Sequence, residues 1–282
     1  MPHQSGSDHN QYLTDRLGKR LIGGPIYFTA GQFAGKIIHA RLQEMQAPVF
    51  GRKTISEFRE ARVDRRPLDP PPVAWLRLFE VFNIGTACET QLEMNYDDID
   101  PSGLMCTVEL FPVPSPESML PNATTDFALS PVDEIWFSKS PDNATTKLVG
   151  TTFVQADSIP WKGRTCLLFT FADLAVKIEG FFILKYRFFD IFSTPGDDTD
   201  PPIQAECCSA PLRIYSTKVC PRLGPSTELS KHLAHYGVRL NVRATERKRK
   251  YQERDVRSPF TTQILRDQAK SESADDERAA AT

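Results

Sequence analysis

The chain has 282 residues, of which 40% are hydrophobic and 10% aromatic, so it can bury the core of one large or two modest domains. Its formal net charge of −2 excludes the global positive field that draws a whole protein onto DNA or an anionic membrane. Any surface that binds nucleic acid must therefore be local.

Twenty-two prolines against fifteen glycines, spread between short apolar runs, favour an all-β domain with stiff loops. The six cysteines lack paired C-x-x-C spacing, so we expect reduced thiols rather than a disulfide framework or a zinc site. No stretch approaches the roughly eighteen apolar residues of a membrane span, and the N-terminus lacks the apolar core of a signal peptide. We therefore expect an intracellular protein that contacts no membrane.

The first third of the chain contains two predicted strands. Residues 1–25 are polar and charged and are predicted to form a flexible arm. Apolar and polar side chains then alternate over residues 36–44, which predicts a half-buried strand. Residues 46–66 are predicted to be a mixed-charge loop. The nearly continuous apolar run over residues 73–82 predicts a central strand.

A clean alternation over residues 106–111 predicts the next strand. Residues 112–147 are rich in Pro, Ser, Asn, Asp and Thr, so we expect a long loop with a short element near residues 134–137.

The strongest pattern lies between residues 165 and 192. Residues 166–171 predict one strand, and a second run over residues 175–191 has apolar side chains at the even positions 176, 178, 182, 184, 186 and 188, which predicts one buried face. The odd positions mix charged residues with Phe181 and Ile183, so the second face is predicted to be partly covered. Phe182, Tyr186 and Phe188 are therefore predicted to be buried, and Lys185 is predicted to lie at the surface. Because that run exceeds the usual length of a strand, Gly180 is predicted to mark a bulge or bend.

Residues 212–216 predict a further strand, after which the period changes. Thr227 can start a short helix with apolar residues at i, i+4 and i+7 (Leu229, Leu233 and Tyr236), and Gly237 can end it. Residues 238–243 alternate again and predict a closing strand. The charged residues 244–282 are predicted to be a disordered tail.

A cluster of arginines precedes a run of three prolines that starts at Pro70. Prolines hold φ near −65° and favour an extended backbone, so the arginines face outward. Arginine offers a planar fork of donors that matches phosphate oxygens and guanine edges, which favours nucleic acid as the partner. A solvated turn before a strand explains the same residues equally well.

Several segments together resemble the velvet family of fungal regulators. The similarity extends from Phe33 to Arg243, in order and at plausible spacing. It is carried by residues 64–72, Phe171-Ala172-Asp173-Leu174-Ala175-Val176-Lys177-Ile178-Glu179-Gly180, Ile203-Gln204-Ala205-Glu206, Leu212-Arg213-Ile214-Tyr215-Ser216-Thr217-Lys218 and Ser226-Thr227-Glu228-Leu229-Ser230.

The resemblance implies a velvet domain over residues 26–243 with a mainly β, immunoglobulin-like (Rel-type) sandwich and one or two short helices. It further implies a nuclear protein, able to shuttle with the cytoplasm, that binds DNA as a homo- or heterodimer with other velvet proteins. Such proteins control development, sporulation and secondary metabolism, and a nuclear methyltransferase is a candidate further partner. No cofactor and no small-molecule substrate are expected.

In family members that bind DNA, a basic loop before the proline run contacts the duplex. The resemblance therefore implies DNA contacts from Arg52, Lys53, Arg62, Asp64, Arg65 and Arg66, with Asp64 expected to orient an arginine. The upstream lysines of such members correspond to Ala61 and Val63, so two expected cations are absent. A structural role in bracing the loop is the alternative for Arg65 and Arg66.

A second basic run, Arg247, Lys248, Arg249 and Lys250, resembles a nuclear import signal or a non-specific phosphate-binding tail, and a solvated charge run is the alternative. The sequence has no phosphate-binding loop, nucleophile elbow or metalloprotease helix, so we expect no enzyme. His232 and His235 are spaced to share a metal but have no evident third ligand, which favours a surface pair.

Three functions are compatible with these patterns. The first is a DNA-binding velvet regulator. The second is a velvet-type scaffold that dimerises and recruits other nuclear proteins without contacting DNA, a reading that Ala61 and Val63 favour. The third is a ligand-binding β-sandwich, which requires a pocket.

Overall fold

Long antiparallel strands dominate the computed structural model, which describes residues 22–54, 66–115, 144–196 and 203–244. All of these residues fall within one of the chain's two compact units, Met1–Glu246. The other unit, Arg247–Thr282, lies outside the described residues. The predicted mainly β fold is confirmed, and the architecture is that of a β-sandwich.

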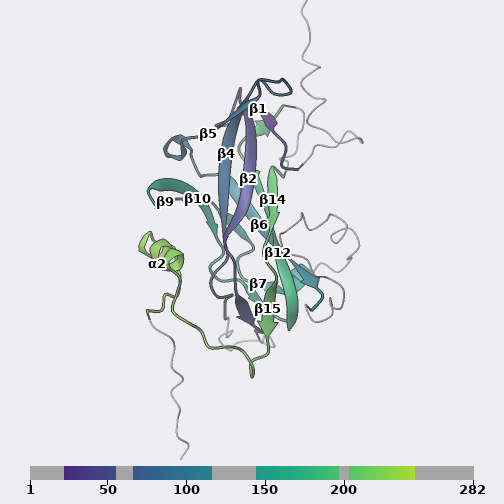
Figure 1. The fold of residues 1–282 in the computed structure, drawn as a ribbon, viewed down its shortest axis with the longest axis vertical. Coiled ribbons are helices and arrows are strands. Elements are labelled where there is room, and N and C mark those ends of the chain that lie inside the picture. Colours follow the sequence, from purple (N-terminus) through teal and green to yellow (C-terminus); the bar gives the residue numbers. More distant parts are fainter. Residues whose placement is uncertain (1–21, 55–65, 116–143, 197–202, 245–282) are drawn as a thin grey trace, which may run out of the picture. The chain divides into compact units, whose positions relative to one another are not determined.

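The first sheet is built from seven strands. They are β1 (Ile26–Ala30), β2 (Ile37–Gln46), β4 (Val73–Phe82), β5 (Thr90–Glu93), β9 (Asp157–Trp161), β10 (Arg164–Thr170) and β13 (Thr194–Pro195). Their order is β13-β1-β2-β4-β10-β9, and β5 also pairs with β4. Figure 1 labels β1, β2, β4, β5, β9 and β10 of this sheet. The central position of β4 confirms the prediction from its continuous apolar run, since both of its faces are covered.

The second sheet is built from six strands. They are β3 (Phe50–Arg52), β6 (Leu104–Val113), β8 (Phe153–Gln155), β12 (Gly180–Asp190), β14 (Ala205–Cys208) and β15 (Leu212–Tyr215). Their order is β3-β15-β12-β6-β8, and β14 also pairs with β12. Four short elements complete the described backbone around the sheets: η1 (Tyr96–Asp98), η3 (Ala144–Lys147) and the paired strands β7 (Leu148–Val149) and β11 (Ala175–Val176).

A single apolar core lies between the two sheets. The first sheet contributes the inward side chains of β2, β4 and β10, and the second sheet those of β6 and β12. The alternation predicted for residues 36–44 and 106–111 is confirmed, because the side chains at the alternating positions lie in this core: Ile38, Ala40, Leu42, Cys106, Val108 and Leu110. Tyr186 and Phe188 are fully buried and Phe182 is 2% exposed. Each such side chain stabilises the fold by about 1.5–3 kcal/mol.

The predicted break in the long run over residues 175–191 is also present. Residues 177–179 interrupt the run between β11 and β12, and Gly180, with a φ of +143°, is the first residue of β12. The prediction that Lys185 lies at the surface is wrong, because the residue is only 8% exposed. Its ammonium lies 2.9 Å from a carboxylate oxygen of Glu206 on the neighbouring β14, so a paired charge makes this burial possible.

The helix α2 (Glu228–His235) forms where it was predicted. The Thr227 hydroxyl accepts a hydrogen bond from the Ser230 amide and caps the helix. Leu229 and Leu233 are buried in a second apolar cluster on the outer face of the first sheet, whereas Tyr236 is 48% exposed, contrary to the predicted face. None of the helices in the described ranges is long and apolar enough to cross a membrane.

Three loop and strand predictions need correction. Residues 238–243 form no strand: Val238 and Leu240 pack against the cluster under α2, and the Arg243 carbonyl accepts from the Ser226 amide. The predicted loop over residues 46–66 contains β3, because Phe50 to Arg52 find a parallel partner in β15. The predicted loop over residues 112–147 is shorter, since β6 runs to Val113 and η3 starts at Ala144; the element expected at residues 134–137 lies outside the described residues.

Candidate nucleic-acid interface

The candidate interface begins at β3, on the edge of the second sheet. Arg52 stands opposite Tyr215 in the parallel pairing of β3 with β15, and the Lys53 amide donates to the Tyr215 carbonyl at 2.9 Å. The Thr54 amide then donates to the Val176 carbonyl, also at 2.9 Å. The backbone that carries Arg52 and Lys53 is therefore anchored on both sides.

The chain returns to the same edge after Arg66, whose side chain is exposed. The Leu68 amide donates to the Leu174 carbonyl at 2.7 Å, and the Leu68 side chain is 2% exposed. Asp69 forms an antiparallel bridge with Phe50, in which the Asp69 amide donates to the Phe50 carbonyl at 3.0 Å. The segments that precede and follow the predicted DNA-contacting loop therefore lie side by side at this edge of the second sheet.

Arg52 and Arg66 belong to the two chain segments that meet at the Phe50–Asp69 bridge, and both lie within electrostatic range of the Cys220 thiol. Burial raises the pKa of this thiol, and the positive charges of Arg52 and Arg66 act in the opposite direction. The two predicted arginines thus come to one place, beside the loop that follows β15. Because Coulomb interactions fall off with distance and screening, both guanidinium groups must lie near the thiol for their charges to act on it.

That loop adds two cations that the resemblance did not assign, Lys218 and Arg222, which are exposed on either side of Cys220. The sequence held a signal for Lys218, since the family-like segment at residues 212–218 ends in this lysine. We define the basic end of the second sheet as Arg52, Lys53, Arg66, Lys218 and Arg222.

Among the described residues, Glu179 forms an ion pair with one of these cations. Glu179 lies 3.6 Å from the Lys53 ammonium, and both side chains are about half exposed. An exposed pair of this kind is worth about 0–1 kcal/mol and leaves Lys53 free to exchange partners. Five cations thus gather with Glu179 in the described part of this edge, in a chain whose formal net charge is −2.

The remaining predicted site residues lie outside the described residues. These are Arg62, Asp64, Arg65, Arg247, Lys248, Arg249 and Lys250. Of the six predicted DNA contacts, the structure thus places Arg52, Lys53 and Arg66, and their roles remain predictions.

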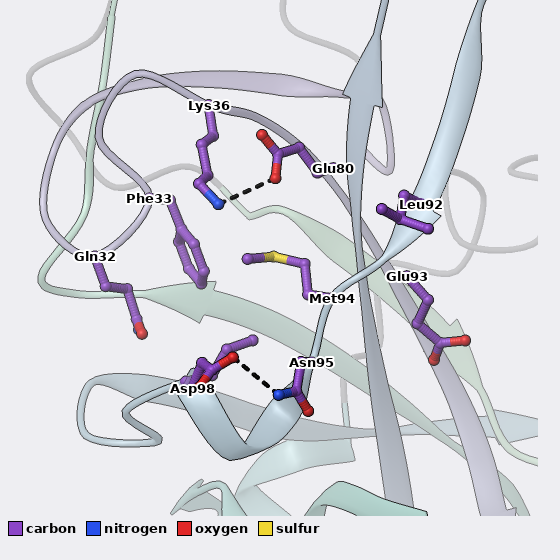
Figure 2. Close-up of a pocket in the computed structure, with 10 residues that line it drawn as sticks. Gln32, Phe33, Lys36, Glu80, Leu92, Glu93, Met94, Asn95 and Asp98 are labelled. Atoms are coloured by element: carbon purple, nitrogen blue, oxygen red, sulfur yellow. Dashed lines mark hydrogen bonds and ion pairs between the residues drawn. The ribbon is translucent and has the colours of Figure 1, made fainter.

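A pocket of about 360 Å³ is present elsewhere, between the turn after β1 and the segment around η1 (Figure 2). The Lys36 ammonium lies 3.0 Å from the Glu80 carboxylate, and the Asn95 amide donates to Asp98 at 2.9 Å. In Figure 2 the side chains of Phe33 and Met94 lie between these two polar pairs. In each pair the two polar groups already bind each other. The pocket therefore gives little support to the hypothesis of a ligand-binding β-sandwich.

The histidines on α2 engage their surroundings rather than each other. The His232 ring nitrogen Nε2 lies 2.6 Å from the Pro160 carbonyl oxygen, and the ring stacks edge-on with Trp161 at 4.9 Å. Within the described part of the chain, no three His, Cys, Asp or Glu side chains are grouped so that they could hold a metal ion.

Comparison with known proteins identifies a family. The family model described as Velvet factor matches residues 40–247. A probable velvet family sexual development regulator of Schizophyllum commune is 48% identical over 231 residues, which are 81% of this chain and 81% of that protein. Another, from Laccaria bicolor, is 43% identical and covers 82% of this chain and 77% of its own length. The developmental and secondary metabolism regulator veA of Emericella nidulans is 26% identical over 77% of this chain and 37% of its own length.

Proposed function

Because this chain belongs to the velvet family, we propose that it is a nuclear regulator of transcription that binds DNA through the basic end of its second sheet. The observation that carries the proposal is the backbone bridge between Phe50 and Asp69, which brings the segments of Arg52, Lys53 and Arg66 to one edge of the second sheet. Its relatives are named for roles in sexual development, or in development and secondary metabolism, and we extend these roles, together with sporulation, to this chain.

The basic end suits phosphate for two physical reasons. Arginine guanidinium groups bind phosphate oxygens through paired, charge-assisted hydrogen bonds. The anchored backbone at Lys53 and Leu68 places the start and the end of the arginine-bearing loop before DNA arrives, so less conformational entropy is lost on binding. Each phosphate neutralised also releases condensed counterions, which makes the binding depend on salt.

The protein acts as a dimer in this proposal. Ala61 and Val63 stand where DNA-binding relatives carry lysines, so one subunit offers fewer phosphate contacts. A second velvet subunit supplies the missing charge, and affinity therefore depends on the partner. The basic run at residues 247–250 serves as the nuclear import signal in this proposal, and shuttling with the cytoplasm follows from its use.

The test is a fluorescence anisotropy titration of duplex DNA with the purified protein, alone and with a second velvet protein. Charge reversal at both Arg65 and Arg66 is expected to abolish binding by the correct dimer. Lys231→Glu is the matched control, because Lys231 is an exposed cation on α2, away from the basic end. Unchanged affinity after the double reversal would show that the site is elsewhere.

The second candidate is a velvet-type scaffold, favoured by the missing cations at Ala61 and Val63. It dimerises and brings other nuclear proteins together, a nuclear methyltransferase among them, without touching DNA. In that case the dimer forms but the labelled duplex stays free at low salt. If DNA binds only when the second velvet protein is present, the result supports the first candidate, with a DNA surface shared by the two subunits.

A further inference from the structure

Three arginines lie over two aromatic rings on the outer face of the first sheet. The Arg164 guanidinium carbon is 4.3 Å from the centroid of the Trp75 ring, and that of Arg41 is 4.7 Å from the Phe79 ring. Arg77 lies between them, 5.2 Å from Trp75 and 4.9 Å from Phe79. We call these three arginines the arginine face.

The two aromatic rings contact the guanidinium groups but are themselves too buried to stack on a partner. Trp75 is 7% exposed and Phe79 8% exposed, so neither ring can stack on a nucleobase. Arg41 and Arg164 are exposed, and Arg41 donates a further hydrogen bond to the Gln91 side chain at 2.9 Å. These contacts orient the arginines before any partner binds, so less side-chain entropy is lost on association.

The helix α2 covers the other half of the same sheet face. Leu229 and Leu233 pack in the cluster that contains Val73 and Trp75, which places the helix beside the N-terminal end of β4. The arginine face starts where this cover ends, since Arg77 and Phe79 lie further along β4. The face therefore combines oriented cations with exposed side chains at Arg41 and Arg164.

A single carboxylate sits within the arginine face. Arg77 donates to both oxygens of Glu93, at 2.9 and 2.5 Å, and hydrogen bonding from Arg77 lowers the pKa of the Glu93 carboxyl, with a smaller contribution from the charge of Arg164. Glu93 thus stays ionised, and the face carries three positive charges against one negative charge. Because Arg77 holds Glu93 in a bidentate pair, the exposed Arg41 and Arg164 on either side of it carry the positive charge that attracts separate carboxylates.

We propose that the arginine face binds an acidic segment of another protein, whose carboxylates pair with Arg41 and Arg164. This surface lies on the first sheet and is separate from the basic end of the second sheet, so it does not depend on DNA binding. Guanidinium groups bind carboxylates in a bidentate geometry, and a ring beneath each guanidinium leaves its N–H edge available.

The test uses a fluorescein-labelled peptide that alternates glutamate with serine, and a second peptide in which glutamine replaces every glutamate. The wild-type protein should bind the glutamate peptide in a salt-dependent manner and should not bind the glutamine peptide. The double variant Arg41→Gln/Arg164→Gln should bind the glutamate peptide at least about tenfold more weakly. Arg77 is left unchanged because its pair with Glu93 supports the sheet.

Arg213→Gln is the matched control. Arg213 is also an exposed arginine over aromatic rings, 5.2 Å from Phe181 and 4.6 Å from Tyr215, but it lies on β15 of the second sheet. It should leave peptide affinity unchanged, and an unlabelled DNA duplex should not displace the peptide from the wild type. Equal binding of both peptides, equal binding by the double variant, or displacement by DNA would each overturn the proposal.

Discussion

The Arg243 guanidinium lies 2.5 Å from the Asp69 carboxylate, and this ion pair joins the last described segment of the chain to the residue before the proline run. Both side chains are about one-fifth exposed. Asp69 also bridges Phe50 through the backbone, so the pair supports the place where the arginine-bearing loop returns to the sheet. This relationship links the stability of the fold to the candidate DNA surface.

Asp69→Asn removes the charge from that pair and leaves the backbone bridge intact. We expect a loss of about 1–2 kcal/mol in the free energy of unfolding, because a charge-assisted bond becomes a neutral one at a partly buried site. Urea unfolding measures the change. Lys231→Gln, on the exposed side of α2, is the control and should change stability by less than about 0.5 kcal/mol.

Arg66→Gln should weaken binding of duplex DNA by the dimer and should lower the slope of log affinity against log salt concentration by about 1 per subunit. The physical reason is the loss of one phosphate contact and of the counterion that it releases. Anisotropy titrations over a salt series measure the slope. Lys231→Gln should leave it unchanged, and an unaltered slope for Arg66→Gln would mean that Arg66 contacts no phosphate.

Because Glu44 is a partly buried carboxyl, the free energy of unfolding is expected to depend on pH. Its carboxylate accepts hydrogen bonds from the Tyr186 hydroxyl at 2.9 Å and from the Ala210 amide at 3.2 Å, so it joins β2 to the second sheet. Burial nevertheless raises the pKa of Glu44 above its ordinary value of 4.5. Between that value and the folded-state pKa, the folded state holds the proton more tightly than the unfolded state. The contribution of this group to stability is therefore present at acid pH and is lost as the pH rises through the folded-state pKa.

Glu44→Gln cannot titrate, so its destabilisation should be larger near pH 4.5 than near pH 7 when unfolding is measured at both. Tyr186→Phe removes a donor to the buried carboxylate and should cost about 1–2 kcal/mol at neutral pH. A destabilisation by Glu44→Gln that grows towards neutral pH would contradict the assigned direction.

A comparison of Gly150 with Gly35 distinguishes the cost of an unfavourable backbone conformation from the cost of a steric clash. Both have positive φ, +109° and +77°, which disfavours any residue with a β-carbon. A β-carbon at Gly150 would collide with the backbone of Asp173, whereas one at Gly35 would meet nothing within 4 Å. Gly35→Ala should cost about 1 kcal/mol from conformation alone. Gly150→Ala should cost about 1–3 kcal/mol more, because the two backbones must move apart. Thermal unfolding of both variants tests this difference.

Local sequence patterns determined the elements of this fold that depend on neighbours in the chain. The period of two fixes which side chains of β2, β6 and β12 face the core, because a one-residue shift would expose them all. The cap at Thr227 and the spacing of Leu229 and Leu233 define α2 for the same local reason. The family-like segments likewise indicated which loop to examine for DNA contacts.

The tertiary structure alone decided what depends on distant partners. Phe50 to Arg52 become a strand only because β15 provides a parallel partner, and residues 238–243 alternate without a strand to pair with. Lys185 is buried because Glu206 arrives from another strand. The basic end and the arginine face are likewise assembled from segments far apart in the chain. Periodicity specifies which side of a strand is apolar, but pairing between remote segments determines which charges meet, and no local pattern contains that information.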